Sequence, residues 1–381
     1  MKDKHLKNIA FGLLVIILAV LAFATVLEKI FDTEFALNEV YYSWWFVALW
    51  GLLAIVSFVY ILRRRLYKQR AAFLLHCAFA VILIGAFVSF ISSERGYIHL
   101  RQGKPLNYFI VEEDKEEVKK SLPFDIQLVL FEIEYHEDSE APSDFISFLR
   151  IDGEMNKVSL NKISIYRNYR LYQIDYDRDE MGTVLLISYD PIGIVITYMG
   201  YVLLALSMLW LLWLRIGWQG CVLVFIPSFA VWYYISQMNP MTPILRTPML
   251  ALHVSVIVIS YLLLLLIAIT STIGVISKKG RRKLYNWNSI LLYPALFLLA
   301  AGIFIGAVWA NISWGRYWGW DAKETWALIT MLVYAIPLHK KSLPLFSNPL
   351  KFHRYCLVAF FAVLMTFLGV SFLLGGIHSY L

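Results

Sequence analysis

Long apolar runs alternate with short polar segments along most of the chain. A helix rises about 1.5 Å per residue, so about 20 apolar residues cross a hydrocarbon core of about 30 Å. The pattern predicts nine spans: Ile9–Leu27, Trp44–Leu62, Ala71–Ser92, Ile192–Leu214, Trp218–Ile235, Met249–Ile276, Ser289–Ala310, Lys323–Leu338 and Tyr355–Ile377. We therefore expect a polytopic α-helical membrane protein with about nine spans.

One stretch, residues 94–190, follows a different pattern. Apolar and polar residues alternate in Phe124–Glu134, Ser164–Tyr176 and Thr183–Tyr189. A repeat of two residues is typical of strands whose two faces meet different surroundings. We therefore expect a small, mainly antiparallel β domain outside the membrane. The charge-dense run Glu112–Lys120 is expected to be a solvated linker or a short helix.

The distribution of charge predicts the orientation. The 381 residues are 60% hydrophobic, and the net charge is +7. If the N-terminus lies inside, the inside loops and tail carry eighteen basic residues and one acid, Asp3. This positive-inside pattern is typical of proteins embedded in membrane lipid. It explains the net positive charge without a nucleic-acid partner. We expect a multi-pass membrane protein with the N-terminus inside and with residues 94–190 and the C-terminus outside.

Aromatic residues are concentrated between the seventh and eighth predicted spans. The stretch Trp314–Trp326 holds four tryptophans and a tyrosine, and it lies at the outer membrane surface. Two interpretations remain open: a platform for a large planar apolar ligand, or an interfacial aromatic belt followed by a helix cap. The candidate platform residues are Trp314, Tyr317, Trp318, Trp320, Asp321 and Trp326.

Four histidines lie in or at the ends of the predicted spans. His76 and His339 lie near inner ends, whereas His253 and His378 lie near outer ends. Each could simply form a hydrogen bond with a neighbouring helix. Two imidazoles can also hold a haem iron between them, so we expect an inner and an outer pair of iron ligands. The remaining histidines are expected at the surface: His5, His99, His136 and His353.

The cysteines offer no other metal site. Cys77, Cys221 and Cys356 lie in or beside apolar runs, and none has a CxxC neighbour. We therefore expect small buried apolar side chains, no disulfide and no metal other than haem iron.

The aromatic stretch resembles a known family. The sequence from Trp314 to Asp321, followed by Lys323-Glu-Thr-Trp326, resembles the WWD domain of haem-handling membrane proteins. It is most similar to the CcsA part of cytochrome c synthases of the fused CcsB–CcsA (System II) type. Ala322 stands where that family often has proline. The phrases around His253, His339 and His378 resemble the histidine positions of the same family.

The first half of the chain resembles the other part of those synthases, CcsB, which is ResB-like. His76 followed by Ile84-Gly-Ala86 is similar to its span histidine. Leu171–Asp177 and Ser188–Pro191 are similar to its outside domain. The resemblance implies N-terminal spans in 1–93, the β domain in 94–190, linking spans in 191–247, and a CcsA-like part in 248–381 with its WWD segment at 314–326.

The resemblance also implies a function in cytochrome c biogenesis. A protein of this type lies in the bacterial cytoplasmic (inner) membrane, exports haem b as its substrate and attaches it, on the periplasmic side, to the CxxCH thiols of apocytochrome c. It is therefore a haem lyase, and a thiol-reducing partner is expected. No residue is assigned as a nucleophile. The alternatives are a b-type membrane electron carrier, a haem exporter that performs no attachment, and a transporter with structural aromatics.

Overall fold

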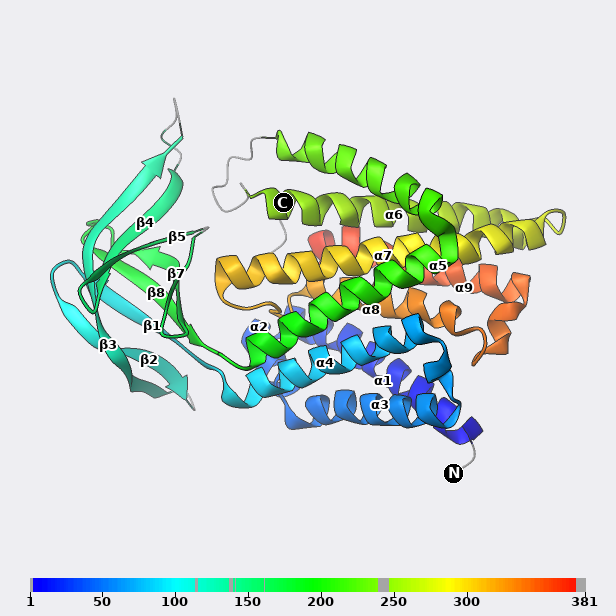
Figure 1. Cartoon of the computed structure of the whole chain (residues 1–381), viewed down its shortest axis with the longest axis horizontal. Helices are drawn as coiled ribbons and strands as arrows, with labels where there is room; N and C mark the ends of the chain where they lie inside the picture. Colours follow the sequence, from blue (N-terminus) through cyan, green and yellow to red (C-terminus); the bar gives the residue numbers. More distant parts are fainter. Residues whose placement is uncertain are drawn as a thin grey trace.

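A β domain lies at one end of a bundle of helices (Figure 1). The computed structural model describes residues 3–113, 116–136, 140, 142–160, 162–238 and 247–374. The helices are α1 (Asp3–Ile30), α2 (Thr33–Ala36), η1 (Leu37–Tyr41), α3 (Trp44–Arg63), η2 (Leu66–Lys68), α4 (Arg70–Ser92), α5 (Gly193–Ser236), α6 (Pro248–Ile276), α7 (Arg281–Trp314), α8 (Ala322–Ala335), η4 (Ile336–His339), η5 (Pro344–Ser347), α9 (Pro349–Leu364) and η6 (Met365–Leu374). Helices α4 and α5 lead into and out of the β domain.

The helical part is that of a multi-pass membrane protein. Among the described residues, seven helices are long and apolar enough to cross a membrane. The number differs from nine for two reasons. Two predicted spans, 192–214 and 218–235, both lie within α5. The eighth predicted span corresponds to α8, which has only 14 residues, although η4 continues it to His339.

Helix α5 reverses its direction near the middle. Gly217 has φ 66° and ψ 179°, a backbone conformation that is essentially restricted to glycine. Figure 1 shows the two halves of α5 running back along the bundle in opposite directions. Each half thus corresponds to one of the two predicted spans.

Helix α7 is the central element of the bundle. Of the most apolar 18 residues of α7, 61% are buried inside the protein. The corresponding value is 11% in α3 and in α4, which lie at the outside of the bundle. Small residues allow close approach in the outer pair of α4 and α5. A Cβ at Gly85 would collide with Thr197, and one at Gly200 would lie 2.6 Å from Ile82. The helices that leave and enter the β domain are therefore packed tightly together.

The β domain is one antiparallel sheet. Its strands are β1 (Glu94–Arg101), β2 (Pro105–Glu113), β3 (Glu116–Tyr135), β4 (Pro142–Ile151), β5 (Glu154–Ser159), β6 (Ser164–Tyr166), β7 (Tyr169–Tyr176) and β8 (Gly182–Tyr189), in the order β5-β4-β3-β2-β1-β8-β7-β6. Phe124, Ile126 and Leu128 alternate inward along β3, which is the predicted pattern. Register shifts interrupt the β2–β3 and β3–β4 pairings, and such bulges bend a sheet.

The charge-dense run Glu112–Lys120 was predicted wrongly. Its described residues belong to β2 and β3, where Val111 pairs with Val118 and Glu112 with Glu117. The charged side chains lie along a hairpin whose backbone groups bond to each other. Lys119 also lies over the ring of Tyr108, 4.7 Å from its centroid. Pairing with a neighbouring strand therefore outweighed the local preference of the charged residues.

Candidate functional site

His76 and His339 lie next to each other inside the helical bundle. His76 is on α4 and His339 ends η4, and their ring centroids are 5.9 Å apart with an interplanar angle of 84°. Phe11 of α1 packs edge-on against His339 at 5.7 Å. Three elements that are distant in sequence thus bring two imidazoles together. Both rings are partly buried.

The backbone sets the tautomer of each ring. Nδ1 of His76 lies 2.7 Å from the carbonyl of Ala72, and Nδ1 of His339 lies 3.0 Å from that of Ala335. A carbonyl can only accept, so Nδ1 donates and Nε2 is the basic nitrogen of the neutral ring. A hydrogen bond from the second ring nitrogen is the usual support of a metal-ligating histidine. Both imidazoles therefore have the form that can bind iron through Nε2.

His253 has the same tautomer on a different helix pair. Its Nδ1 donates to the carbonyl of Gly302 at 2.7 Å, which ties α6 to α7. A Cβ at Gly306 would lie 2.5 Å from this Nδ1, so glycine makes room for the ring. His378, its predicted partner, lies outside the described residues. The inner pair is thus brought together, whereas the outer pair remains a prediction.

His353 is a buried structural residue and not the surface residue we expected. Its exposed fraction is 0%. Its Nδ1 lies 3.2 Å from Oγ of Ser271, and its Nε2 lies 3.3 Å from the carbonyl of Arg281. The basic neighbours in sequence, Lys351 and Arg354, are exposed on another side of α9, and their charges made the position look solvated. Both ring nitrogens are occupied by protein groups.

The tryptophan-rich stretch folds as a tight loop between α7 and α8. Trp320 has φ 56°, an uncommon left-handed conformation for a large residue. Its ring stacks on Tyr41 of η1, with centroids 4.6 Å apart and planes 8° apart. Trp318 meets it edge-on at 5.8 Å. Tyr41 therefore already provides Trp320 with a flat aromatic partner.

The other predicted platform residues also have contacts within the chain. Trp326 is buried and donates to Oγ1 of Thr25 at 3.1 Å. The ring of Trp314 packs against Trp309 at 4.8 Å. Asp321 accepts from the backbone N–H of Lys323 at 2.8 Å and caps α8. Asp321 is therefore the N-cap of α8, as one of the two interpretations of the stretch predicted. That these residues bind a planar ligand stays a prediction.

The loop is anchored to the base of the β domain by a buried carboxylate. Asp190 is 3% exposed, and it accepts from Ser89 at 2.6 Å and from Tyr317 at 3.1 Å. Burial raises the pKa of the Tyr317 hydroxyl to about 12, so this hydroxyl stays protonated and can donate. Oδ1 of Asp190 also accepts from the N–H of Gly193 at the start of α5. One side chain thus joins α4, α5 and the loop.

No role was predicted for Tyr41 or Asp190 from the sequence. The run Tyr41-Tyr-Ser-Trp-Trp45 at the start of the second predicted span is a dense aromatic cluster, and it could have indicated an aromatic partner for the loop. Asp190 gave no local signal, because its partners are remote in sequence.

Two family models match adjacent parts of the chain. The family described as cytochrome C assembly protein matches residues 192–378, and the ResB-like family matches residues 63–193. His76 and the β domain lie in the ResB-like part. His339, His253 and the tryptophan-rich loop lie in the assembly part. The inner histidine pair therefore forms where the two parts meet.

Individual relatives cover only a portion of the chain. Protein NrfI of Wolinella succinogenes is 38% identical over 162 residues, which are 39% of this chain and 18% of NrfI. Cytochrome c biogenesis protein CcsA of Chlamydomonas reinhardtii is 38% identical over 164 residues, 40% of this chain and 46% of CcsA. CcsA of Guillardia theta is 33% identical over 190 residues, and the match covers 41% of this chain and 63% of that CcsA. The chain thus spans less than two thirds of the length of each of these relatives.

Proposed function

From the premise that the chain belongs to the cytochrome c assembly family and carries a ResB-like part, we propose that it is a cytochrome c synthase of the fused CcsB–CcsA type. Its substrates are haem b, taken from the inner side of the membrane, and the CxxCH segment of an apocytochrome c. Its product is a cytochrome with covalently attached haem. The site of attachment lies on the periplasmic side of the bacterial inner membrane.

The observation that carries this proposal is the inner histidine pair. His76 comes from the ResB-like part and His339 from the assembly part, with ring centroids 5.9 Å apart. With a metal–nitrogen bond of about 2 Å, two imidazoles on opposite sides of one ion have centroids about 6 Å apart. The spacing therefore suits one iron between the rings, and neither part alone supplies both ligands.

The outer site is proposed to hold the same substrate during attachment. His253 and His378 are its iron ligands, and Trp314, Tyr317, Trp318, Trp320, Asp321 and Trp326 form the aromatic surface beside it. The stacking of Tyr41 on Trp320 supports the proposal that the loop holds a flat ring. For haem to use the face of Trp320 on which Tyr41 stacks, Tyr41 has to move away.

The attachment reaction requires that the haem vinyl groups and the CxxCH thiols are held close together, and it requires no nucleophile from the enzyme. Each cysteine S–H adds across one haem vinyl group, so that an S–C bond forms on one vinyl carbon and the proton goes to the other. The addition is redox-neutral and requires reduced thiols, which a thiol-reducing partner supplies. Fixed haem and a bound CxxCH segment supply proximity.

Coexpression tests the proposal. The full chain and a CxxCH apocytochrome are produced in a host without a cytochrome c maturation system, and covalent haem is detected by haem staining of the denatured cytochrome. We expect stained cytochrome with the wild-type chain and at least a tenfold loss with His76→Ala or His339→Ala. An SxxSH substrate is the matched control and should remain unstained.

The remaining outcomes separate the alternatives. Haem that purifies with the chain without any stained cytochrome would favour the b-type electron carrier. Stained cytochrome at wild-type levels with the double variant His76→Ala/His339→Ala would remove the inner pair from the reaction. A wild-type chain that neither binds haem nor yields stained cytochrome would refute the proposed function.

A further inference from the structure

Two arginines of the β domain meet the helical bundle without a carboxylate partner. Arg95 on β1 donates from Nη2 to the carbonyl of Gly315 at 2.9 Å. Arg170 on β7 donates from Nη1 to Oδ1 of Asn311 at 2.8 Å. Neither forms an ion pair with any described residue, whereas Arg101 in the same domain pairs with two aspartates. A half-buried charge without a counter-charge is costly, so these two positions call for an explanation.

The two guanidinium groups leave the same face of the sheet. Arg95 and Arg170 both pair with Ser188 of β8, from its two sides. Residues directly opposite each other in an antiparallel pair share a face. Two strand spacings put their Cα atoms about 10 Å apart. Ser188 between them is buried and small. The sheet thus presents a pair of positive groups toward the end of α7.

Buried donors without acceptors surround this pair. Nε of Arg95 and Nδ2 of Asn311 have no hydrogen-bond partner among the described residues, and the hydroxyl of Tyr172, which lies beside Arg170, donates to none of them. Asn311 and Tyr172 are each only 1% exposed. A Cβ at Gly315 would lie 2.8 Å from Cε2 of Tyr172, so the hydroxyl-bearing ring lies directly against the loop. Each of these groups can donate, and a cluster of unmatched donors suits a ligand made of acceptors.

We propose that Arg95 and Arg170 bind the two propionate carboxylates of haem at the tryptophan-rich loop, with Tyr172 and Asn311 as additional donors. This inference rests on the proposed function. Arginine binds carboxylates through two parallel N–H bonds, and haem carries two carboxylates on one edge. Gly315 and Asn311, the groups that the arginines contact, lie on either side of Trp314. Propionates held here bring the haem edge to the aromatic loop.

Haem and its dimethyl ester distinguish a carboxylate contact from general apolar binding. Full-length protein freed of haem is titrated in detergent with each ligand. The variants are Arg95→Gln, Arg170→Gln, the charge-conserving Arg95→Lys and Arg170→Lys, and the control Arg178→Gln on the exposed β7–β8 turn. Expression yield and thermal unfolding are recorded for each variant, and the lysine variants retain charge if a glutamine variant fails to fold.

The expected result is selective loss. Wild type prefers haem to its ester by roughly tenfold to a hundredfold, as for hydrogen bonds to a charged group. Each glutamine variant loses most of this preference and keeps its affinity for the ester, the lysine variants are intermediate, and Arg178→Gln is unchanged. Equal losses for both ligands, or no loss, would overturn the inference.

Two further outcomes have separate meanings. Titration in nanodiscs of neutral lipid and of anionic lipid tests whether the arginines bind an anionic lipid headgroup. A preference for haem that disappears in anionic lipid overturns the propionate assignment in favour of the headgroup. A wild-type chain that binds neither ligand and matures no cytochrome refutes the proposed function. A chain that matures cytochrome while both arginine variants keep full haem preference refutes only the inference.

Discussion

At the scale of single residues, hydrogen bonds distinguish the inner histidine pair from His353. His76, His339 and His253 each donate through Nδ1 to a backbone carbonyl. His353 has protein partners at both nitrogens. The same residue type in the same bundle therefore has two kinds of hydrogen bonding, and position along the sequence does not distinguish them.

His353→Ala is expected to lower stability without changing haem ligation. Removal of the ring leaves Ser271 and the Arg281 carbonyl without this partner, at a cost of about 1–3 kcal/mol. Thermal unfolding in detergent should show a lower midpoint, while the low-spin haem spectrum stays as in wild type. Loss of the low-spin bands at full stability would show that His353 is a ligand after all.

Gly306→Ala is expected to displace His253. The new methyl group would lie 2.5 Å from Nδ1 of His253, so the ring or α7 must shift at a cost of about 1–3 kcal/mol. We expect several-fold less holocytochrome in the coexpression assay. Gly51→Ala is the matched control, because a Cβ there has no atom within 4 Å. Equal yields from the two variants would argue against a role for His253.

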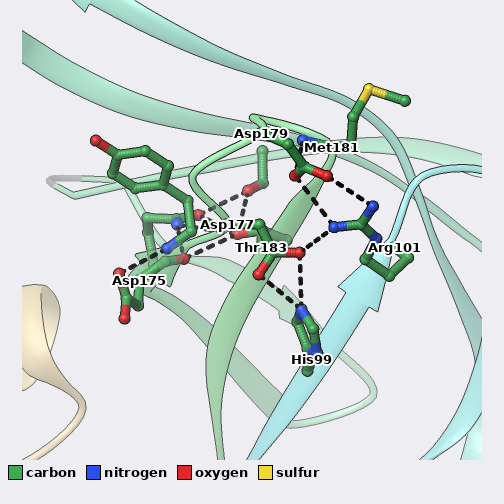
Figure 2. Close-up of polar contacts among 10 residues, drawn as sticks. His99, Arg101, Asp175, Asp177, Asp179, Met181 and Thr183 are labelled. Atoms are coloured by element: carbon green, nitrogen blue, oxygen red, sulfur yellow. Dashed lines mark hydrogen bonds and ion pairs between the residues drawn. The ribbon is translucent and has the colours of Figure 1, made fainter.

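At the scale of elements, two short features shape the molecule: the reversal within α5 and the turn between β7 and β8. The turn is clamped to β1 at the end of the strand away from the membrane. Figure 2 shows His99 and Arg101 facing Asp177 and Asp179. Arg101 lies 2.6 Å from Asp177 and 2.8 Å from Asp179, and His99 lies 3.0 Å from Asp177.

Gly217→Ala is expected to destabilise the hairpin of the two α5 halves. No atom lies within 4 Å of a Cβ at this position, so the cost comes only from the backbone conformation, about 1–3 kcal/mol. Thermal unfolding should detect it, and Gly51→Ala again serves as control. An unchanged midpoint would show that the reversal tolerates a side chain.

The β7–β8 turn is expected to loosen in acid. Hydrogen bonds from Arg101 hold the pKa of both Asp177 and Asp179 below the usual value, and His99 adds to the effect at Asp177. A carboxyl group whose pKa is lower in the folded than in the unfolded state stabilises the fold at pH values above its unfolded pKa of about 4. This stabilisation is lost as the pH falls through the pKa of the folded state. Hydrogen-exchange protection of residues 177–182 should fall below pH 4. Arg101→Gln should weaken this dependence, with only the contribution of His99 at Asp177 remaining, and an unchanged dependence would contradict the assignment.

At the scale of the whole molecule, the sequence predicted the helices and the β domain well and their mutual contacts poorly. The period-two pattern of Phe124–Glu134 correctly predicted a strand, in which Phe124, Ile126 and Leu128 are buried, because alternation is a local property. The depth of a residue in the membrane also follows from its position within its own span, which is why His76 and His339 could be placed at the same membrane level from the sequence. Their actual proximity, like the stacking of Tyr41 on Trp320, depends on how distant helices pack. At Glu112–Lys120 and at His353 the neighbouring charges indicated solvent exposure, whereas long-range pairing and packing determine the structure.

The orientation of the molecule is open to a labelling experiment. In a background without Cys77 and Cys221, Glu154→Cys in the β domain should react with a membrane-impermeant maleimide in intact cells. Lys341→Cys, in a basic loop at the opposite end of the bundle, should react only after permeabilisation. Both positions are exposed, so accessibility depends on sidedness. The reverse pattern would place the β domain inside the cell.

The most direct test of the account is the iron ligation of the purified full chain. Electron paramagnetic resonance of oxidised protein from haem-replete cells reports whether two imidazole nitrogens bind the iron. In a His253→Ala background, which removes the proposed outer pair, we predict a low-spin two-imidazole signal that His76→Ala and His339→Ala each abolish and that added imidazole restores. A signal that is identical in this background with and without the double substitution His76→Ala/His339→Ala would contradict the claim that the two parts of the chain hold one haem between them.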